Sequence, residues 1–432
     1  MKKFIALLAV LAMVFAMVAC AAPAPAAEPA APATEEATEA PAATEATAEE
    51  AAAPAIKIGV ILIGDENEGY TYAHIEGIKG AIAALGISED QVIWKYSIPE
   101  DETCYDTAVD LAEQGCTIIF SNSYSHQSYM VQAAEEYPDV MFCPATGDTA
   151  AVCGLKNVVN FFPYTYESRY VSGVVAGMKL KELMDAGSVT DPYIGYVGAY
   201  PYAEVVSGYT AFFLGIKSIV PTAHMQVVYT NSWFDMTKEA EAANTLMSMG
   251  CVIIGQHADS TGAPSAVQAK LSEGKVCYSV GYNVDMLSVA PTAALTSAQN
   301  NWSVLYKDIL SDFMSGAEMK HDYSVGYNED AVQISALGES CAAGTAEKVA
   351  EVIAGLKAGT LHVFDAATFT VGGAAVTTAP FDFSTMNADY SAVQYQGPTE
   401  ECIVNGYFHE SEFRSAPYFT LRIDGITEPE AK

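Results

Sequence analysis

The stretch Lys57–Ile63, with the sequence KIGVILI, decides the fold of this chain. A short and almost wholly apolar run of this kind is typical of a buried parallel β-strand. An amphipathic stretch at 72–85 follows it and predicts a helix. Further strands are predicted at 91–94, 117–120 and 140–143, alternating with helices at 105–114 and 127–136. This alternation predicts right-handed βαβ crossovers and one doubly wound α/β sheet.

A second series of the same kind begins after a long helical stretch at 167–186. Strands are predicted at 194–198, 225–229, 251–255 and 276–280, with helices between them that end near 219, 249 and 272. Two similar α/β lobes in one chain are the plan of a hinged binding protein. Ligands of doubly wound sheets bind outside the carboxyl ends of the strands, so the residues after each strand are the candidates for a site.

The first 55 residues predict where the protein is located. Lys2 and Lys3 precede an apolar run, and Met17–Cys20 (MVAC) ends it, which is the pattern of a bacterial lipoprotein signal. We expect a signal peptide at 1–19 and lipidation of Cys20, which anchors the protein to the extracytoplasmic face of the cell membrane. The alternative is a plain secreted protein. Residues 20–55 are almost all Ala, Pro, Thr and Glu and predict an unstructured tether.

The composition excludes several classes of function. The formal net charge of −33 and the lack of a basic cluster argue against nucleic acid as a partner, because such binding neutralises phosphates with Lys and Arg. Eight cysteines besides Cys20 leave disulfides and buried thiols both open, and none has the spacing of a metal or redox site. We expect no metal and no cofactor. The common motifs of hydrolases and nucleotide-binding enzymes are absent, so we expect no enzyme.

The residues that follow the predicted strands offer aromatic rings, amides and carboxylates. The segment 64–74 follows the first strand and contains Tyr70, and the segment 121–124 contains Asn122. In the second series, Trp233 and Asp259 follow two strands, and 281–285 follows another. Such a lining suits a flat ligand that lies between rings and has its polar edges fixed by amides.

Several stretches carry a resemblance to a known family. They are 69–74 (GYTYAH), 166–173 (YESRYVSG), 233–235 (WFD), 256–260 (QHADS) and 295–297 (LTS) with Asn301 and Trp302. In these stretches the chain resembles the basic membrane protein family of ABC-transporter substrate-binding lipoproteins, and within it a branch thought to bind purine bases such as adenine. The resemblance extends from Ile56 through essentially the whole chain.

The strand ends and the resemblance together give a set of expected ligand-binding residues. They are Asn67, Tyr70, Thr71, Asn122, Trp233, Asp259, Asn283 and Asp285. Tyr70 and Trp233 match the positions of the family's stacking rings. The family's ribose-binding carboxylate falls on Asn283 and a lysine falls near Asn300. Because an amide cannot accept two hydroxyl protons as a carboxylate can, a free base is favoured over a nucleoside.

Each of these residues also has a purely structural interpretation. Tyr70 and Trp233 could be core aromatics, and Asp259 and Asp285 could cap helices or hold loops. His74 and His257 are expected to orient loops through hydrogen bonds. For Arg169 we expect a hinge contact or a salt bridge between the lobes rather than ligand binding.

The sequence therefore predicts a type I periplasmic-binding-protein fold of two doubly wound α/β lobes joined by a hinge. Lobe 1 is expected at 56–165 plus about 290–322, and lobe 2 at 166–289 plus about 323–432. We expect a monomeric substrate-binding lipoprotein that binds a purine base or nucleoside, adenine-like, and docks on an ABC permease and ATPase complex. The alternatives are a sensory receptor that presents its ligand, and a hydrolase acting on a nucleoside-like substrate. A hydrolase would convert the ligand, whereas a receptor returns it unchanged.

Overall fold

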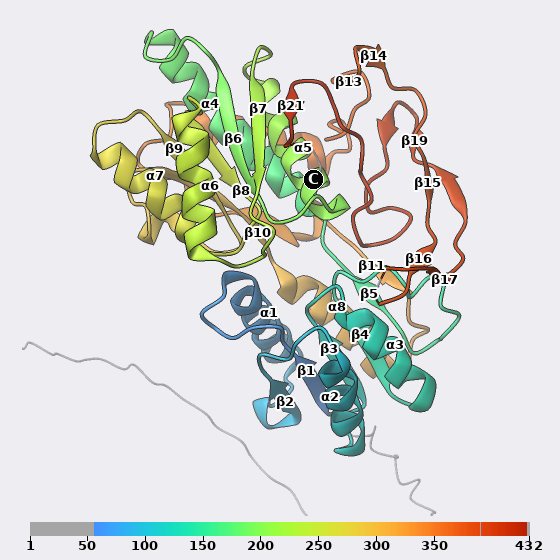
Figure 1. Ribbon diagram of the computed structural model, residues 1–432. Helices are drawn as coiled ribbons and strands as arrows, with labels where there is room; N and C mark the ends of the chain where they lie inside the picture. The colour runs from blue at the N-terminus through green and yellow to red at the C-terminus, as the bar shows by residue number, and fades with distance from the viewer. Residues whose placement is uncertain (1–55, 389, 430–432) are drawn as a thin grey trace, which may run out of the picture. The chain divides into compact units, whose positions relative to one another are not determined.

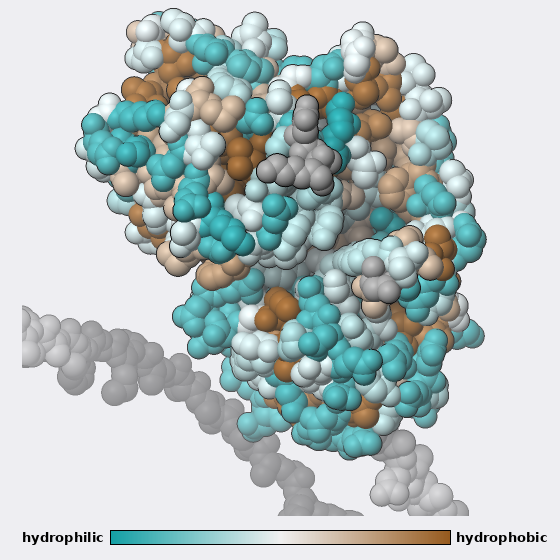
Figure 2. Space-filling model, in the orientation of Figure 1, coloured by the Kyte–Doolittle hydropathy of each residue, from teal (hydrophilic) through white to brown (hydrophobic). Residues whose placement is uncertain are grey.

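The computed structural model describes residues 56–388 and 390–429, and Figure 1 shows its course. The predicted signal peptide, the lipidation site at Cys20 and the tether lie outside the described residues. Among the residues that the structure describes, no helix is long and apolar enough to cross a membrane. Figure 2 shows that hydrophilic residues cover most of one face, with apolar residues in separate small patches, as expected of a chain with so large a net charge.

The first lobe contains a four-stranded parallel sheet in the order β2-β1-β3-β4. Its strands are β1 (Ile58–Ile61), β2 (Val92–Lys95), β3 (Ile118–Ser121) and β4 (Met141–Pro144). Its helices are α1 (Gly69–Leu85), α2 (Glu102–Glu113), α3 (His126–Glu136) and α8 (Trp302–Ser315). Helices α1 and α8 pack on one face of the sheet and α2 and α3 on the other, so β1 is buried throughout. All four predicted strands are confirmed.

The second lobe contains a seven-stranded sheet in the order β12-β10-β9-β8-β6-β7-β21. The strands are β6 (Tyr193–Gly198), β7 (His224–Tyr229), β8 (Ile253–Gln256), β9 (Tyr278–Tyr282), β10 (Ala294–Asn300), β12 (Val332–Ile334) and β21 (Ile426–Thr427). The helices are α4 (Thr165–Asp185), α5 (Ala203–Lys217), α6 (Met236–Ser248), α7 (Gly262–Ser272) and α9 (Thr345–Lys357). Only β12 runs antiparallel to its neighbour. The second predicted series of strands is confirmed.

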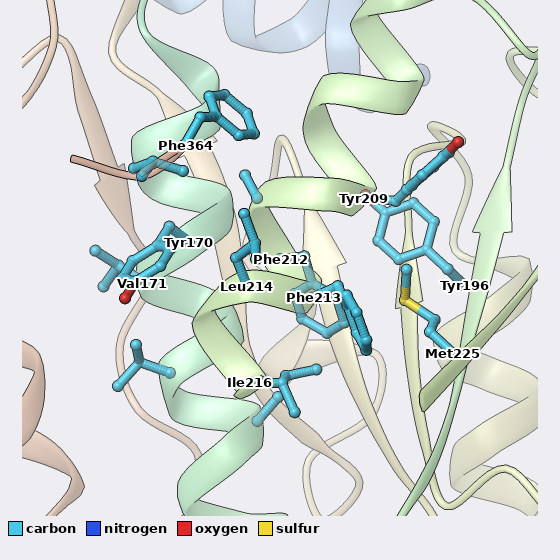
Figure 3. Close-up of a cluster of buried hydrophobic side chains, with 14 of the residues drawn as sticks. Tyr170, Val171, Tyr196, Tyr209, Phe212, Phe213, Leu214, Ile216, Met225 and Phe364 are labelled. Carbon is cyan, nitrogen blue, oxygen red and sulfur yellow. The ribbon is translucent and has the colours of Figure 1, made fainter. Parts of the chain in front are cut away.

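A large apolar core lies between α4, α5 and the second sheet. Tyr170, Phe212 and Ile216 belong to it, and Figure 3 labels Tyr170 on α4 and Phe212 and Ile216 on α5. The helices approach closely because each presents a glycine at the crossing: a Cβ on Gly173 would lie 2.1 Å from the Phe212 carbonyl oxygen. This close packing holds α4 against α5.

Within the residues that the structure describes, the chain crosses between the lobes three times. It leaves the first lobe after β5 (Asn160–Phe161) and enters α4, and it returns to the first lobe at α8. It leaves again after β11 (Asp322–Tyr323), which pairs in parallel with β5. Because β10 extends the second sheet, the return crossing comes at Asn301, later than the expected limit near residue 290.

The C-terminal segment forms short two-stranded pieces that the sequence did not predict. They are β13 (Thr370–Val371) with β14 (Ala374–Ala375), β15 (Pro380–Asp382) with β18 (Thr399–Glu401), β16 (Thr385–Met386) with β17 (Val393–Tyr395), and β19 (Ile403–Val404) with β20 (Tyr407–Phe408). The aromatic residues Phe383, Phe408 and Phe419 of this segment join the core of the second lobe. The eight cysteines of the described residues are all free thiols.

Candidate functional site

A cleft of about 500 Å³ lies where the carboxyl ends of the two sheets face each other. The first lobe lines it with residues that follow β1, β2, β3 and β4. The second lobe contributes residues that follow β6, β7 and β8, together with the end of β9, and the C-terminal segment contributes four more. Both its size and its position at the strand ends are typical of a small-molecule site.

Aromatic rings make up much of the lining in the second lobe. Trp233 is half-buried, and its ring centroid lies 5.6 Å from that of Tyr200 and 6.3 Å from that of Tyr202. Tyr282 at the end of β9 is buried and lines the cleft, and its hydroxyl has no hydrogen-bond partner in the described part of the chain. These rings offer flat faces to a ligand, with polar groups at their edges.

Asp259 is the buried carboxylate of this end of the cleft. Its backbone N–H donates to the Trp233 carbonyl at 2.8 Å, and its Oδ1 accepts from the Asn283 side-chain amide at 2.6 Å. Burial, with the charges of Glu68, Glu239 and Glu204 nearby, raises the pKa of Asp259 well above its usual value. The Asn283 bond fixes one oxygen of Asp259, and the other oxygen is left for a ligand.

Glu204, in the first turn of α5, is a second carboxylate at the same end. Its Oε1 lies 3.2 Å from Nε2 of the buried His257. Burial raises the pKa of Glu204 to about 7, although the nearby Arg169 opposes the shift. Burial and the same arginine lower the pKa of His257 well below its usual value, so we assign a neutral imidazole that donates from Nε2 to Glu204.

Arg169 of α4 lies beneath the cleft as its buried cation. Its Nη1 donates to the Gln256 carbonyl at 2.6 Å, and its guanidinium carbon lies 3.6 Å from the centroid of the Tyr282 ring. Among residues 56–388 and 390–429 it forms no salt bridge. The expectation of a salt bridge between the lobes is therefore wrong, and Arg169 instead offsets the charges of Glu204 and Asp259.

The first lobe positions its site residues through a chain of hydrogen bonds. The Tyr70 hydroxyl donates to the Asn122 carbonyl at 2.5 Å, and Asn122 Oδ1 accepts from the Ile63 N–H at 2.8 Å. The Asn122 amide donates to the Thr71 hydroxyl at 3.3 Å, which in turn donates to Glu68. Burial raises the pKa of Glu68, which lines the cleft as a third carboxylate at this end.

The structure brings four of the eight predicted ligand-binding residues into the cleft. They are Tyr70, Asn122, Trp233 and Asp259. Thr71 does not line the cleft, and its hydroxyl accepts from the Asn122 amide and donates to Glu68. Asn283 reaches the cleft only through its bond to Asp259, and its own side chain lines a separate outer groove between α1 and β10.

Two further predicted residues lie away from the cleft for local reasons. Asn67 is exposed, and its backbone N–H and side-chain amide both bond Asp65 within a turn. Asp285 accepts from the Leu287 N–H at 2.9 Å and caps a short helical turn, which is the structural alternative weighed for it above.

The opposite end of the cleft is built by β4 and the C-terminal segment. Arg414 Nη1 lies 3.2 Å from Asp148 Oδ2, and both side chains are more than nine-tenths buried. The Tyr124 hydroxyl donates to Asp148 at 3.0 Å, and the Tyr390 ring stacks on Tyr124. Asp148 and Arg414 therefore form a buried ion pair at this end of the cleft, which Glu100 also lines.

Sequence reasoning missed several of these residues. Tyr200, Tyr202 and Glu204 follow β6, and the rule that ligands bind at strand ends would have found them had it been applied to that strand. Arg414 and Tyr390 carried no such signal, because the segment around them has neither a strand-helix pattern nor a motif. No group of three or more His, Cys, Asp or Glu side chains in the described ranges is arranged to hold a metal ion.

Comparisons with known proteins agree with this geometry. A family model described as ABC transporter substrate-binding protein, PnrA-like, matches residues 56–354. A purine-binding protein of Brucella abortus (strain 2308) is 32% identical over 285 residues, which cover 66% of this chain and 76% of that protein. A putative ABC transporter glucose-binding protein of Haloferax volcanii is 33% identical over 206 residues, 48% of each chain.

Solved structures confirm the predicted fold. A solute-binding protein of an ABC transporter system from Conexibacter woesei superposes with a TM-score of 0.56 at 19% identity, covering 71% of this chain and 98% of that one. One from Aeropyrum pernix K1 gives a TM-score of 0.57 at 16% identity, covering 71% and 87%. The two-lobe α/β fold of a periplasmic binding protein is thus shown.

Proposed function

Because this chain belongs to the PnrA-like family of ABC transporter substrate-binding proteins, we propose that its cleft binds a purine, with adenine preferred. Proteins of this kind bind small ligands and work with a permease and an ATPase. The relative from Brucella, named for purine binding, supports the ligand class.

One observation carries the proposal: aromatic faces and unbalanced carboxylates meet at the same end of the cleft. The half-buried Trp233 and the exposed Tyr202 line the cleft and offer faces on which a flat heterocycle can stack. Glu204 and Asp259 beside them each use one oxygen in the protein and have a second for the ligand. In either protonation state these carboxyl groups keep acceptor oxygens, which suit the exocyclic amino group and the ring N–H of adenine.

A free base is preferred to a nucleoside in this proposal. The positions at which the resemblance places the ribose contacts, Asn283 and Asn300, line the outer groove rather than the cleft. Asn283 is committed to Asp259, and Asn300 Oδ1 accepts from the Thr165 hydroxyl at 2.9 Å. Asn283 Oδ1 and Asn300 Nδ2 have no partner in the described part of the chain, but neither residue is among those that line the cleft, so the resemblance's ribose positions lie outside it.

Mass spectrometry of the ligand released from purified protein tests the ligand class. We expect a purine, unmodified by the protein. A non-purine ligand would contradict the proposal, and a ligand that is converted on incubation would favour the enzyme alternative.

We further propose that the protein acts as a monomer in import, from a lipid anchor on the extracytoplasmic face of the cell membrane. The lobes would close on the ligand by a hinge movement and present the closed form to the permease. The pattern at Met17–Cys20 supports the anchor. A Cys20→Ser variant should remain unprocessed or leave the membrane fraction, whereas wild-type protein should carry acyl chains on Cys20. Wild-type protein cut elsewhere, with Cys20 unmodified, would contradict the anchor.

A further inference from the structure

The C-terminal segment closes one side of the cleft, although it lies beyond the part of the chain matched by the family model. Tyr390, Arg414, Ala416 and Pro417 line the cleft. Figure 1 shows this segment, in orange and red, running from the second lobe to β5 and β11. There the Ser415 N–H and hydroxyl donate to Asp322 at 2.8 and 2.7 Å. The segment is therefore attached to both lobes.

Arg414 is held in place by aromatic rings of the C-terminal segment and by Asp148. Its guanidinium lies 5.3 and 5.4 Å from the ring centroids of Phe381 and Phe383, which belong to the same segment, and its side chain is 9% exposed. Asp148 is its one ion-pair partner in the described part of the chain, through Nη1. Nε has no hydrogen-bond partner there. A guanidinium has five N–H donors, so this group keeps donors that the protein does not use.

Asp148, in contrast, is fully engaged. Its Oδ1 accepts from the Gln127 amide at 3.1 Å, and its Oδ2 accepts from Tyr124 at 3.0 Å besides facing Arg414. Its role is therefore to fix the arginine. Asp322 is also close enough to Arg414 for the guanidinium charge to oppose the rise in its pKa that burial causes. With two carboxylates beside one guanidinium, this end does not favour an anion, and a neutral hydrogen-bond acceptor is the group that fits.

We propose that Arg414 is a specificity-determining residue that donates a hydrogen bond to a ring nitrogen of the bound purine. This inference rests on the proposed function and deepens it. Each edge of adenine carries an N–H donor beside a bare ring nitrogen, and N3 lies across the ring system from the exocyclic amino group, so a bare nitrogen faces one end of the cleft when the amino group faces the other. The carboxylates Glu204 and Asp259 accept from the donors at one end of the cleft, while Arg414 donates to a ring nitrogen at the other. The C-terminal segment thereby fixes the orientation of the heterocycle.

Calorimetry with adenine and its 1-, 3- and 7-deaza analogues tests this. Each analogue replaces one ring nitrogen by C–H and so removes one acceptor. For wild-type protein we expect one analogue to bind at least about tenfold more weakly than adenine, because a hydrogen bond to a charged donor is lost. In an Arg414→Met variant the same analogue should bind within about threefold of adenine.

Three further variants keep the result interpretable. Arg414→Met combined with Asp148→Asn removes both charges, so no unpaired charge stays buried if the single variant folds poorly. Arg414→Lys retains a cation and should recover part of the discrimination. Arg422→Met is the matched control, because Arg422 is exposed and pairs with Glu428 outside the cleft.

Two results would overturn the inference while leaving purine binding intact. One is wild-type protein that binds all three analogues as tightly as adenine. The other is an Arg414→Met variant that weakens every ligand equally and keeps the discrimination, which would make the role of Arg414 structural only. Wild-type protein that binds no purine at all would instead overturn the proposed function, and this inference with it.

Discussion

The two ends of the cleft differ in how their charges are balanced. At one end Glu68, Glu204 and Asp259 share a single buried guanidinium, that of Arg169. At the other end Asp148 pairs directly with Arg414. The first end therefore has acceptor oxygens to offer, and the second has N–H donors to offer. A ligand bound between them is oriented by its own pattern of donors and acceptors.

The largest expected effect tests the unbalanced end through the pH dependence of stability. In the unfolded chain the Glu204 carboxyl ionises near its ordinary pKa of 4.5, whereas in the fold it keeps its proton until about pH 7. Between these values the unfolded state binds fewer protons, so the free energy of unfolding falls as pH rises, by at most about 3 kcal/mol for this group.

Urea denaturation of the ligand-free protein between pH 4.5 and 7.5 measures this effect. Glu204→Gln should reduce the fall, because the variant has no proton to lose. Some fall should remain, since burial also raises the pKa of Glu239 to about 7 and that of Glu410 to about 8. Identical pH dependence in the variant and in wild-type protein would mean that Glu204 is not desolvated.

The next largest effect concerns the stacking ring at the same end. Trp233→Ala should weaken ligand binding by about tenfold to a hundredfold, the value of stacking a base on an aromatic side chain. Trp233→Phe should retain most of the affinity because a face remains. Stability should change little, because Trp233 is only half-buried at the cleft.

Trp94 provides the matched control, since it is also half-buried but stacks on Tyr96 away from the cleft. Trp94→Ala should leave binding unchanged in titration calorimetry. If Trp233→Ala instead melts at a much lower temperature while its folded fraction binds normally, Trp233 is a core residue.

A smaller effect on ligand affinity distinguishes a residue that holds the cleft from one that lines only the outer groove. Asn283→Ala removes the amide that holds Asp259, so we expect affinity to fall roughly fivefold to tenfold, the value of one such hydrogen bond. Asp285→Ala, two residues along, should leave affinity unchanged, since Asp285 caps a turn and lines only the groove. Equal losses in both variants, measured by calorimetry, would show that the two surfaces do not act separately.

The strands and one part of the site could be predicted from the sequence. Apolar runs such as Ile58–Ile61 are buried on both faces, and the rule that ligands bind at strand ends led to Tyr70, Asn122, Trp233 and Asp259. The same rule failed for Asp285, because the backbone turns through a left-handed residue at Asn283 (φ 60°) and carries the following residues away from the cleft.

The contribution of the C-terminal segment to the cleft could not be predicted, for a different reason. Arg414 and Asp148 are 266 positions apart, and only the course of the C-terminal segment brings them together. Its short paired strands show no clear period, so neither their pairing nor their approach to the first lobe could be derived from the pattern of residues.

Titration calorimetry of purified protein with adenine and with adenosine tests the central claim most directly. Carboxyl oxygens lie beside Trp233, whereas Asn283 and Asn300, the positions that the resemblance gives for ribose contacts, line the outer groove, so we predict that adenine binds with the lower Kd. Adenosine binding more tightly than adenine, or neither purine binding, would contradict the account.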